Sequence, residues 1–234
     1  MRNIFFTSLL LFATFLKLSA QTQHQNTGWF MFVNNTKFNK KWGLQFDLQV
    51  RSADDWDHVR NTLVRPALQY FINDKSNVAL GYLWQTTKSA ADVSDDVFLH
   101  EHRIFEQYIF NHKLKSVFAS HRFRVEQRFI GRANDDVFAQ RFRYFFRFIQ
   151  PIKKTKAAFA NGVFVALQNE IFLNIQNKHQ LNNSFFDQNR LYVAGGYRFS
   201  KKMDLEVGYM NQAIKNVSNH TNNNIIQLAV YTRF

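Results

Sequence analysis

Residues 121–129, HRFRVEQRF, alternate charged or polar side chains with apolar ones at a period of two. Successive side chains of an extended strand point to opposite faces, so this segment has one apolar face and one face of arginines. Residues 140–148, QRFRYFFRF, repeat the pattern. A chain built from such segments needs different surroundings on its two faces. This feature restricts the fold to the all-β class.

The same period runs along the rest of the chain, most clearly in WGLQFDLQVR (42–51) and IIQLAVYTRF (225–234). Strands are predicted at about residues 27–36, 42–52, 60–71, 77–88, 98–110, 117–130, 138–149, 157–172, 187–199, 203–213 and 224–234. Most exceed the roughly 5–6 residues typical of soluble sheets and suit the roughly 9–11 residues of a tilted strand that crosses a bilayer.

The connections alternate between short and long. The short ones are TKFNKK, INDKS, NHKLKS, QPIKKTK and SKK, and the long ones include SADDWDHV, KSAADVSDDV, GRANDDV, LNIQNKHQLNNSFFD and IKNVSNHTNNN. Lysines gather in the short turns and aspartates in the long loops. This pattern is typical of an antiparallel transmembrane up-and-down β-barrel with short periplasmic turns and longer extracellular loops.

The N-terminal segment narrows the cellular context. Arg2 precedes an apolar run that ends at Leu16, and the small residues Ser19 and Ala20 follow. This order predicts a signal peptide over residues 1–20 and a single barrel domain over residues 21–234. We therefore expect the outer membrane of a Gram-negative cell, with membrane lipid and the barrel-assembly machinery as partners. The formal charge of +13 then points to an anionic membrane surface or an anionic ligand and not to nucleic acid, which an exported protein does not routinely meet.

Arginines lie within the predicted strands, nearly all on the face opposite the aromatic side chains. They are Arg51, Arg65, Arg103, Arg122, Arg124, Arg128, Arg141, Arg143, Arg147, Arg190, Arg198 and Arg233. In a membrane barrel the apolar face meets lipid and the arginines line a polar lumen. In a soluble, lipocalin-like barrel or a sandwich the apolar face points inward. Periodicity does not separate the two, but strand length and loop asymmetry favour the membrane barrel.

Strand number and phase raise two difficulties. Eleven segments is an odd number, whereas bacterial barrels are normally even. About ten wall strands are therefore expected, with segment 27–36 packed elsewhere, and twelve is the alternative. Glu106 also falls on the apolar face of segment 98–110, which implies either a β-bulge or a different phase there.

The C-terminal QLAVYTRF resembles the assembly signal of outer-membrane barrels, with Phe234 as the final aromatic, although Thr232 stands where an aromatic is common. The blocks HRFRVEQRF, RFRYFFRF, NEIFLN, FDQNRLYVAGGYRF and LEVGYMNQ resemble an uncharacterised family of predicted outer-membrane β-barrel proteins, the domain of unknown function numbered twenty-four ninety. This resemblance spans nearly all of the chain after residue 20. It implies a fold and a location, and no catalytic residues.

No constellation of side chains indicates an enzyme, a cofactor or a metal site. Ser120 and His121 are adjacent and so point to opposite faces, which is the wrong geometry for a nucleophile and its base. His100 and His102 share a face but need Glu106 as a third metal ligand. The inward carboxylates at positions 204 and 206 face many arginines, which predicts salt bridges and not acid–base chemistry.

The lumen is therefore the candidate site. Its centre is the hairpin of segments 117–130 and 138–149, whose inner face carries Arg122, Arg124, Glu126, Arg128, Arg141, Arg143 and Arg147. Like charges on neighbouring strands destabilise a sheet, so carboxylates from elsewhere or a bound anion must compensate. The hypothesis is a narrow anion-attracting channel or a solute-binding barrel. The alternatives are a structural or adhesive barrel that acts through its loops and, least favoured, an enzyme acting on lipid or peptide.

Overall fold

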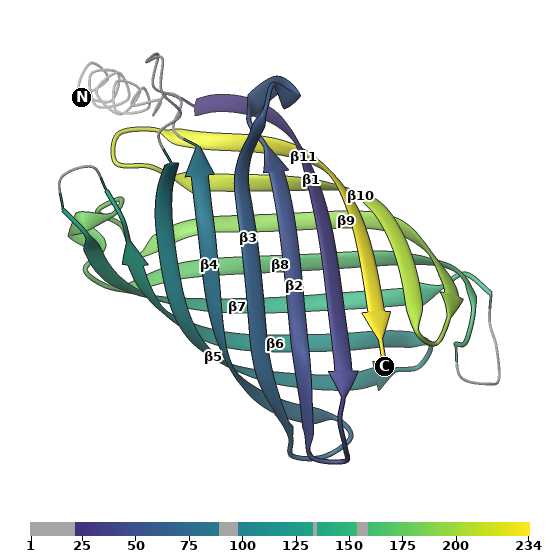
Figure 1. Cartoon of the computed structure of the whole chain (residues 1–234). Helices are drawn as coiled ribbons and strands as arrows, with labels where there is room; N and C mark the ends of the chain where they lie inside the picture. The colour runs from purple at the N-terminus through teal and green to yellow at the C-terminus, as the bar shows by residue number, and fades with distance from the viewer. Residues whose placement is uncertain (1–21, 89–97, 133–134, 154–158) are drawn as a thin grey trace, which may run out of the picture.

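The chain folds into a closed β-barrel (Figure 1) in a computed structural model that describes residues 22–88, 98–132, 135–153 and 159–234. The predicted signal peptide, residues 1–20, lies outside the described residues. The strands are β1 (Thr22–Lys37), β2 (Trp42–Ser52), β3 (Val59–Phe71), β4 (Ser76–Lys88), β5 (Phe98–Leu114), β6 (Val117–Ile130), β7 (Val137–Pro151), β8 (Gly162–Gln176), β9 (Phe186–Ser200), β10 (Met203–Lys215) and β11 (His220–Arg233). Two short 3-10 helices, η2 (Asp54–Trp56) and η3 (Lys178–Gln180), lie in long connections. Within the described part of the chain, no helix is both long and apolar enough to span a membrane.

Each strand pairs with its neighbour in the chain, and β1 closes the barrel by pairing with β11. The all-β, up-and-down barrel is thus confirmed, but the described residues form eleven wall strands, not ten or twelve. Segment 27–36 belongs to β1 and is part of the wall. An odd number of up-and-down strands makes the first and last strands parallel, and β1 and β11 do pair in parallel from Thr22 and His220 onward. Figure 1 shows their arrows pointing the same way, side by side.

The two chain ends of the described barrel therefore lie at opposite ends of the wall. β1 begins at the end that carries the long connections, and β11 finishes at the end that carries the short turns (Figure 1). The last residue completes the seam, because the Phe234 amide donates to the Asn35 carbonyl at 2.9 Å and the Lys37 amide donates to the Phe234 carbonyl at 2.7 Å.

The apolar face of the strands points away from the lumen. In β2, Trp42 and Leu44 are exposed whereas Gln45 and Asp47 are buried, as the sequence predicts. Large exposed apolar side chains continue around the wall, among them Leu68, Leu80, Ile104, Val165, Leu191, Val207 and Leu228. In a soluble barrel the apolar side chains would be buried and the polar ones exposed. The structure therefore decides which face is the inner one.

Two local expectations need correction. Strand β5 pairs with both neighbours without a register shift, so Glu106 lies on the outer face in the expected phase and no bulge is present there. It accepts a hydrogen bond of 3.0 Å from Gln127, which shares that face. For the segment expected at 157–172, residues 157 and 158 lie outside the described residues, and the observed strand β8 begins at Gly162, whose φ of +119° is outside the extended region, and runs to Gln176.

Large aromatic rings fill part of the interior, which the sequence pattern does not reveal. Phe164 is fully buried and packs over Gly196, where an added Cβ would lie 2.3 Å from the ring. Phe105 packs over Gly81 in the same way, at 2.2 Å. Because glycine has no side chain, each of these two positions makes room for a ring that extends over part of the lumen. The interior is therefore a mixture of packed rings, polar side chains and open space.

Candidate functional site in the barrel lumen

The arginines in the two strands of the β6–β7 hairpin all line the lumen, and every one of them has a carboxylate within 4.0 Å. The pairs are Arg122–Glu170, Arg124–Glu126, Arg128–Glu101, Arg141–Glu126, Arg141–Asp187, Arg143–Glu126, Arg143–Glu170 and Arg147–Glu206. Most of these carboxylates come from β5, β8, β9 and β10. The negative charge that the hairpin needs is thus supplied by Glu126 of the hairpin and by carboxylates of nearby strands of the barrel wall.

Glu126 is the centre of this network. Its side chain is fully buried, one of its oxygens lies 2.6 Å from Arg141 Nη2, and the other binds Arg143. Arg124 and Arg103 lie farther away, at 3.7 Å and 4.0 Å. One carboxylate is therefore the shared counter-charge of four guanidinium ions that cannot lose their protons.

Asp187 joins the network through a β-bulge. The register between β8 and β9 shifts between Phe172 and Leu173, and this shift inserts Asp187 as an extra residue in β9. The bulge turns its carboxylate inward, where it lies 2.7 Å from Arg141 Nη1. The strand period places this residue outward, so no sequence signal identified it as part of the lumen.

Several guanidinium groups also stack on aromatic rings inside the barrel. The Cζ atom of Arg124 lies 4.2 Å from the ring centre of Phe105, and that of Arg143 lies 4.3 Å from the ring centre of Phe172. Stacking leaves the edge N–H groups of a guanidinium free for carboxylates. These inner aromatic side chains were missed because sequence reasoning assigned aromatics to the outer face.

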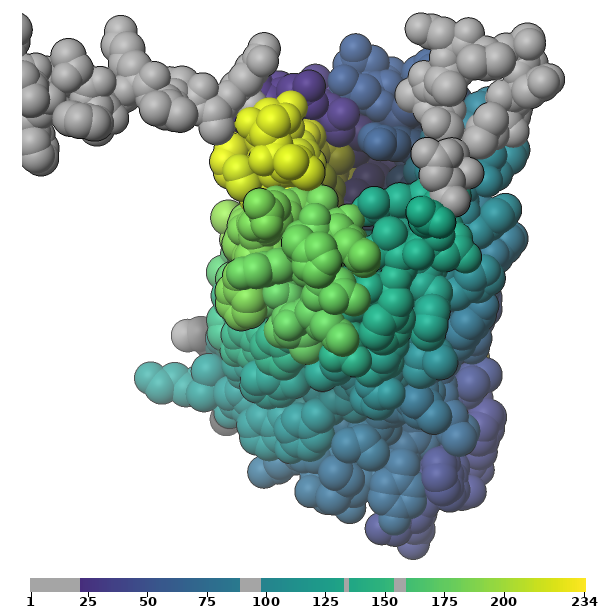
Figure 2. Space-filling view, turned by 90° about the vertical axis from the view of Figure 1, so that its left-hand side faces the viewer, coloured from purple at the N-terminus to yellow at the C-terminus, as the bar shows by residue number. Residues whose placement is uncertain are grey.

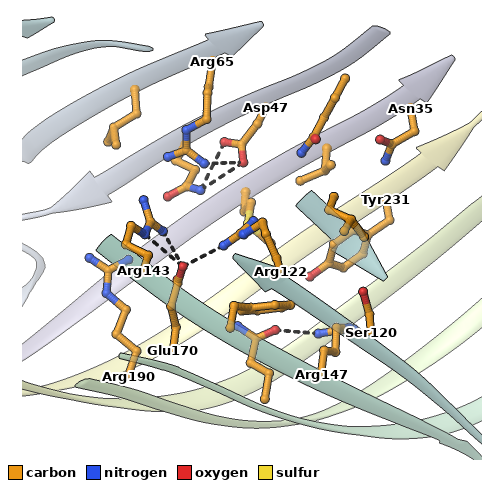
Figure 3. A pocket seen from close by; sticks show the side chains of 18 of the residues that line it. Asn35, Asp47, Arg65, Ser120, Arg122, Arg143, Arg147, Glu170, Arg190 and Tyr231 are labelled. Atoms are coloured by element: carbon orange, nitrogen blue, oxygen red, sulfur yellow. Dashed lines mark hydrogen bonds and ion pairs between the residues drawn. The ribbon is translucent and has the colours of Figure 1, made fainter. Parts of the chain in front are cut away.

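Open space remains beside the network. A cavity of about 740 Å³ is lined by residues from strands all around the barrel, including Asp47, Arg65, Arg190 and Tyr231. Figure 3 shows Arg122 and Arg143 both joined to Glu170, and Arg65 joined to Asp47. Such a cavity lies between the packed interior of a barrel of about eight strands and the open channel of one with sixteen.

The strand arginines predicted to line the lumen divide into two groups. Ten of them form an ion pair with a carboxylate: Arg65, Arg103, Arg122, Arg124, Arg128, Arg141, Arg143, Arg147, Arg198 and Arg233. Arg51 and Arg190 have no carboxylate within 4.0 Å in the described part of the chain. Each donates only to a glutamine, Gln49 and Gln188 respectively.

The residues considered for catalysis lie as the sequence predicts. Asp204 pairs with Arg198 and Arg233, and Glu206 pairs with Arg147, so both are salt-bridge partners. Ser120 lines the cavity. His121 lies on the outer face, where it stacks on His112 with 5.2 Å between the ring centres.

His100 and His102 lie outside the lumen as well. The His100 ring stacks on Trp84 at 6.0 Å, and the His102 ring contacts the Tyr82 hydroxyl. Among the described residues, no three histidine or acidic side chains gather closely enough to hold a metal ion.

These observations define a class: a closed up-and-down β-barrel with an apolar outer surface and an interior of arginine–carboxylate pairs around a central cavity. The chain belongs to the family described as "Protein of unknown function (DUF2490)", whose model matches residues 26–224. This match confirms the family resemblance of the sequence blocks and spans β1 to the middle of β11.

One relative shows that the similarity extends over whole chains. An uncharacterized protein of Methylorubrum extorquens (strain AM1) is 24% identical over 238 residues, which cover 99% of this chain and 98% of the relative. No solved structure matches the chain.

Proposed function

We propose that this protein is an outer-membrane β-barrel whose positively charged lumen binds small anions or lets them pass. The observation that carries the proposal is the arrangement of the two faces. Apolar side chains such as Leu80, Val165 and Leu228 are exposed all around the wall, where only lipid makes that exposure favourable. The charged side chains are turned inward, where arginines outnumber carboxylates.

The rims of the wall support a membrane location. Aromatic side chains ring the short-turn end on the outer face, with Trp42 and Tyr70 in edge contact at 5.0 Å and Tyr197 and Phe199 in edge contact at the same separation. Aromatic girdles of this kind lie at the membrane–water interface of barrels. Lysines of the short turns lie just beyond them, as expected for side chains that face water.

The contents of the lumen favour a binding barrel or a narrow path over a general porin. Ion pairs join β7 to β9 and β10, which are not its neighbours in the wall, and the buried ring of Phe164 occupies part of the cross-section. The remaining cavity of about 740 Å³ suits a small solute. An excess of fixed positive charge raises the local concentration of anions.

A two-part experiment tests the proposal. Cells that express the full chain are fractionated, and the purified barrel is then reconstituted into planar bilayers across a salt gradient. We expect recovery with the outer membrane and a reversal potential that favours anions. The variant Arg122→Gln should shift the potential toward cations, whereas Lys40→Gln in the β1–β2 turn should leave it unchanged. Recovery as a soluble periplasmic monomer would refute the location. A barrel that neither conducts nor binds anions would refute the lumen function.

The connections at the long-loop end favour one second candidate, a structural or adhesive barrel. The buried amide of Asn182 donates to the carbonyls of Phe186 and Lys215 and accepts from Asn174, so the β8–β9 connection is tied to β10. Figure 2 shows this connection (green) packed next to the β10–β11 turn (yellow). A surface-adhesion defect on deletion of the gene, without anion selectivity of the purified barrel, would identify this second role.

A further inference from the structure

Two arginines stand apart from the ion-pair network of the lumen. Among the strand arginines predicted to line the lumen, Arg51 near the end of β2 and Arg190 in β9 are the two without a carboxylate partner in the described part of the chain. The buried Nε–H group of each has no hydrogen-bond acceptor. An unpaired donor in a buried place costs free energy unless an acceptor arrives. The inference that follows rests on the proposed function, because it names the anion site within the same lumen.

Both guanidinium groups converge on one indole ring. The Cζ atom of Arg51 lies 3.8 Å from the ring centre of Trp29, and that of Arg190 lies 5.0 Å from it. Trp29 of β1 is directly opposite Arg51 in the β1–β2 register, and it is 7% exposed. The ring holds the two cations near each other, which is unfavourable without a counter-charge.

The hydrogen-bond partners of this pair are neutral, although Glu170 stands directly opposite Arg190 in the β8–β9 register. Gln49 and Gln188 each accept one hydrogen bond from an arginine of the pair, and Gln212 donates to Gln188. The neighbouring carboxylates are already occupied. Asp47 binds Arg65 at 3.0 Å, and Glu170 binds Arg122 and Arg143, each at 2.7 Å. Figure 3 shows Arg190 beside Arg143 and Glu170 with no interaction drawn to either.

The pair is also open to a solute. Arg51, Arg190, Trp29 and Gln188 all line the cavity of about 740 Å³. Arg51 is one residue from the end of β2 at the long-loop rim, so the pair lies in the half of the lumen near the long loops.

We infer that Arg51 and Arg190, held by Trp29, form a binding site for a small oxyanion such as a phosphate or carboxylate group. The planar guanidinium matches two oxygens of such a group, and stacking on the ring orients the planes while leaving their N–H edges free. The hairpin arginines offer less, because their N–H groups already bind carboxylates such as Glu126 and Glu101, which an incoming anion would have to displace. The anion site of the lumen is thus separate from the hairpin.

The test uses the purified full-length mature barrel in a phosphate-free, non-ionic detergent at low ionic strength. Inorganic phosphate and succinate are titrated separately by calorimetry, with chloride as the reference anion. We expect saturable binding of at least one of the two oxyanions, which also distinguishes a phosphate from a carboxylate ligand. The variants Arg51→Gln and Arg190→Gln should each weaken it by about tenfold or more, because each removes a charged, bidentate donor. Arg60→Gln, which removes an exposed charge near the same rim, should leave the affinity unchanged.

Arg51→Lys and Arg190→Lys provide a second set of variants that retain the charge. They should fold, as judged by the heat-dependent mobility of the barrel, and still bind phosphate more weakly because the planar fork is lost. Wild-type affinity in all four variants, or no saturable binding to the wild-type barrel, would overturn the inference. If the barrel is anion-selective in bilayers and the variants bind the oxyanion as tightly as the wild type, this site is refuted and the proposed function is not. If the protein is absent from the outer membrane but binds an oxyanion, and the four variants weaken that binding, the site is supported and the proposed outer-membrane function is refuted.

Discussion

The substitution Glu126→Gln gives the sharpest test of the ion-pair network. The carboxylate of Glu126 is fully buried and lies within 4.0 Å of Arg141, Arg143, Arg124 and Arg103. Gln has nearly the same shape, so the change removes one negative charge and little else. The arginines remain charged because the guanidinium does not lose its proton in proteins.

The structure indicates how large the effect should be. Removing one partner of a buried ion pair typically costs about 3–5 kcal/mol. Arg141 keeps Asp187 at 2.7 Å and Arg143 keeps Glu170 at 2.7 Å, which limits the loss. Arg124 keeps only neutral Gln107, at 2.6 Å. We therefore expect a loss at the lower end, about 3 kcal/mol of the free energy of unfolding.

Denaturant unfolding of the purified barrel in detergent or lipid, followed by circular dichroism, measures this loss. The control is Asp74→Asn, which removes one charge from an exposed turn and should change the free energy of unfolding by about 0.5 kcal/mol or less. A change below about 1 kcal/mol for Glu126→Gln would refute the argument that this carboxylate neutralises the hairpin. A stabilised barrel with strong phosphate binding at the hairpin would refute it as well.

Three further predictions concern packing, assembly and topology. Gly196→Ala should destabilise the barrel by about 1–3 kcal/mol because its Cβ would overlap the Phe164 ring, whereas Gly195→Ala, with no atom within 4 Å of its Cβ, should be nearly neutral in the same unfolding assay. Deletion of Phe234 should lower the yield of assembled barrel in the membrane fraction, because its amide and carbonyl close the β1–β11 seam; normal assembly of the shortened chain would contradict this role. An epitope at the mature N-terminus should be labelled on intact cells and one at the C-terminus only after permeabilisation, because the described strands end at opposite rims; labelling of both ends from one side would contradict the parallel closure.

The sequence predicted the all-β class, the extent of most strands and the side chains that share each face. These features follow from local geometry, because a strand alternates its side chains wherever it lies. Segment 42–52 was predicted with both its bounds and its faces, as β2 shows. The salt-bridge role of Asp204 and Glu206 followed from the same period. The strand predicted over 157–172 overlaps β8 but starts too early, because the backbone of Gly162 leaves the extended region, which no alternation of residues records.

Tertiary structure decided the rest. Which face is the inner one depends on how the sheet closes, and the count of eleven strands depends on whether β1 pairs with β11. The inward position of Asp187 comes from a bulge, which is a property of the register between two strands and not of either strand alone. Tertiary structure also decides which lumen arginines have a carboxylate partner and which do not. Arg147 and Arg51 look alike in the sequence, but the closed barrel brings Glu206 of β10 to Arg147 of β7, 59 residues away along the chain, whereas no carboxylate of the described residues lies within 4.0 Å of Arg51.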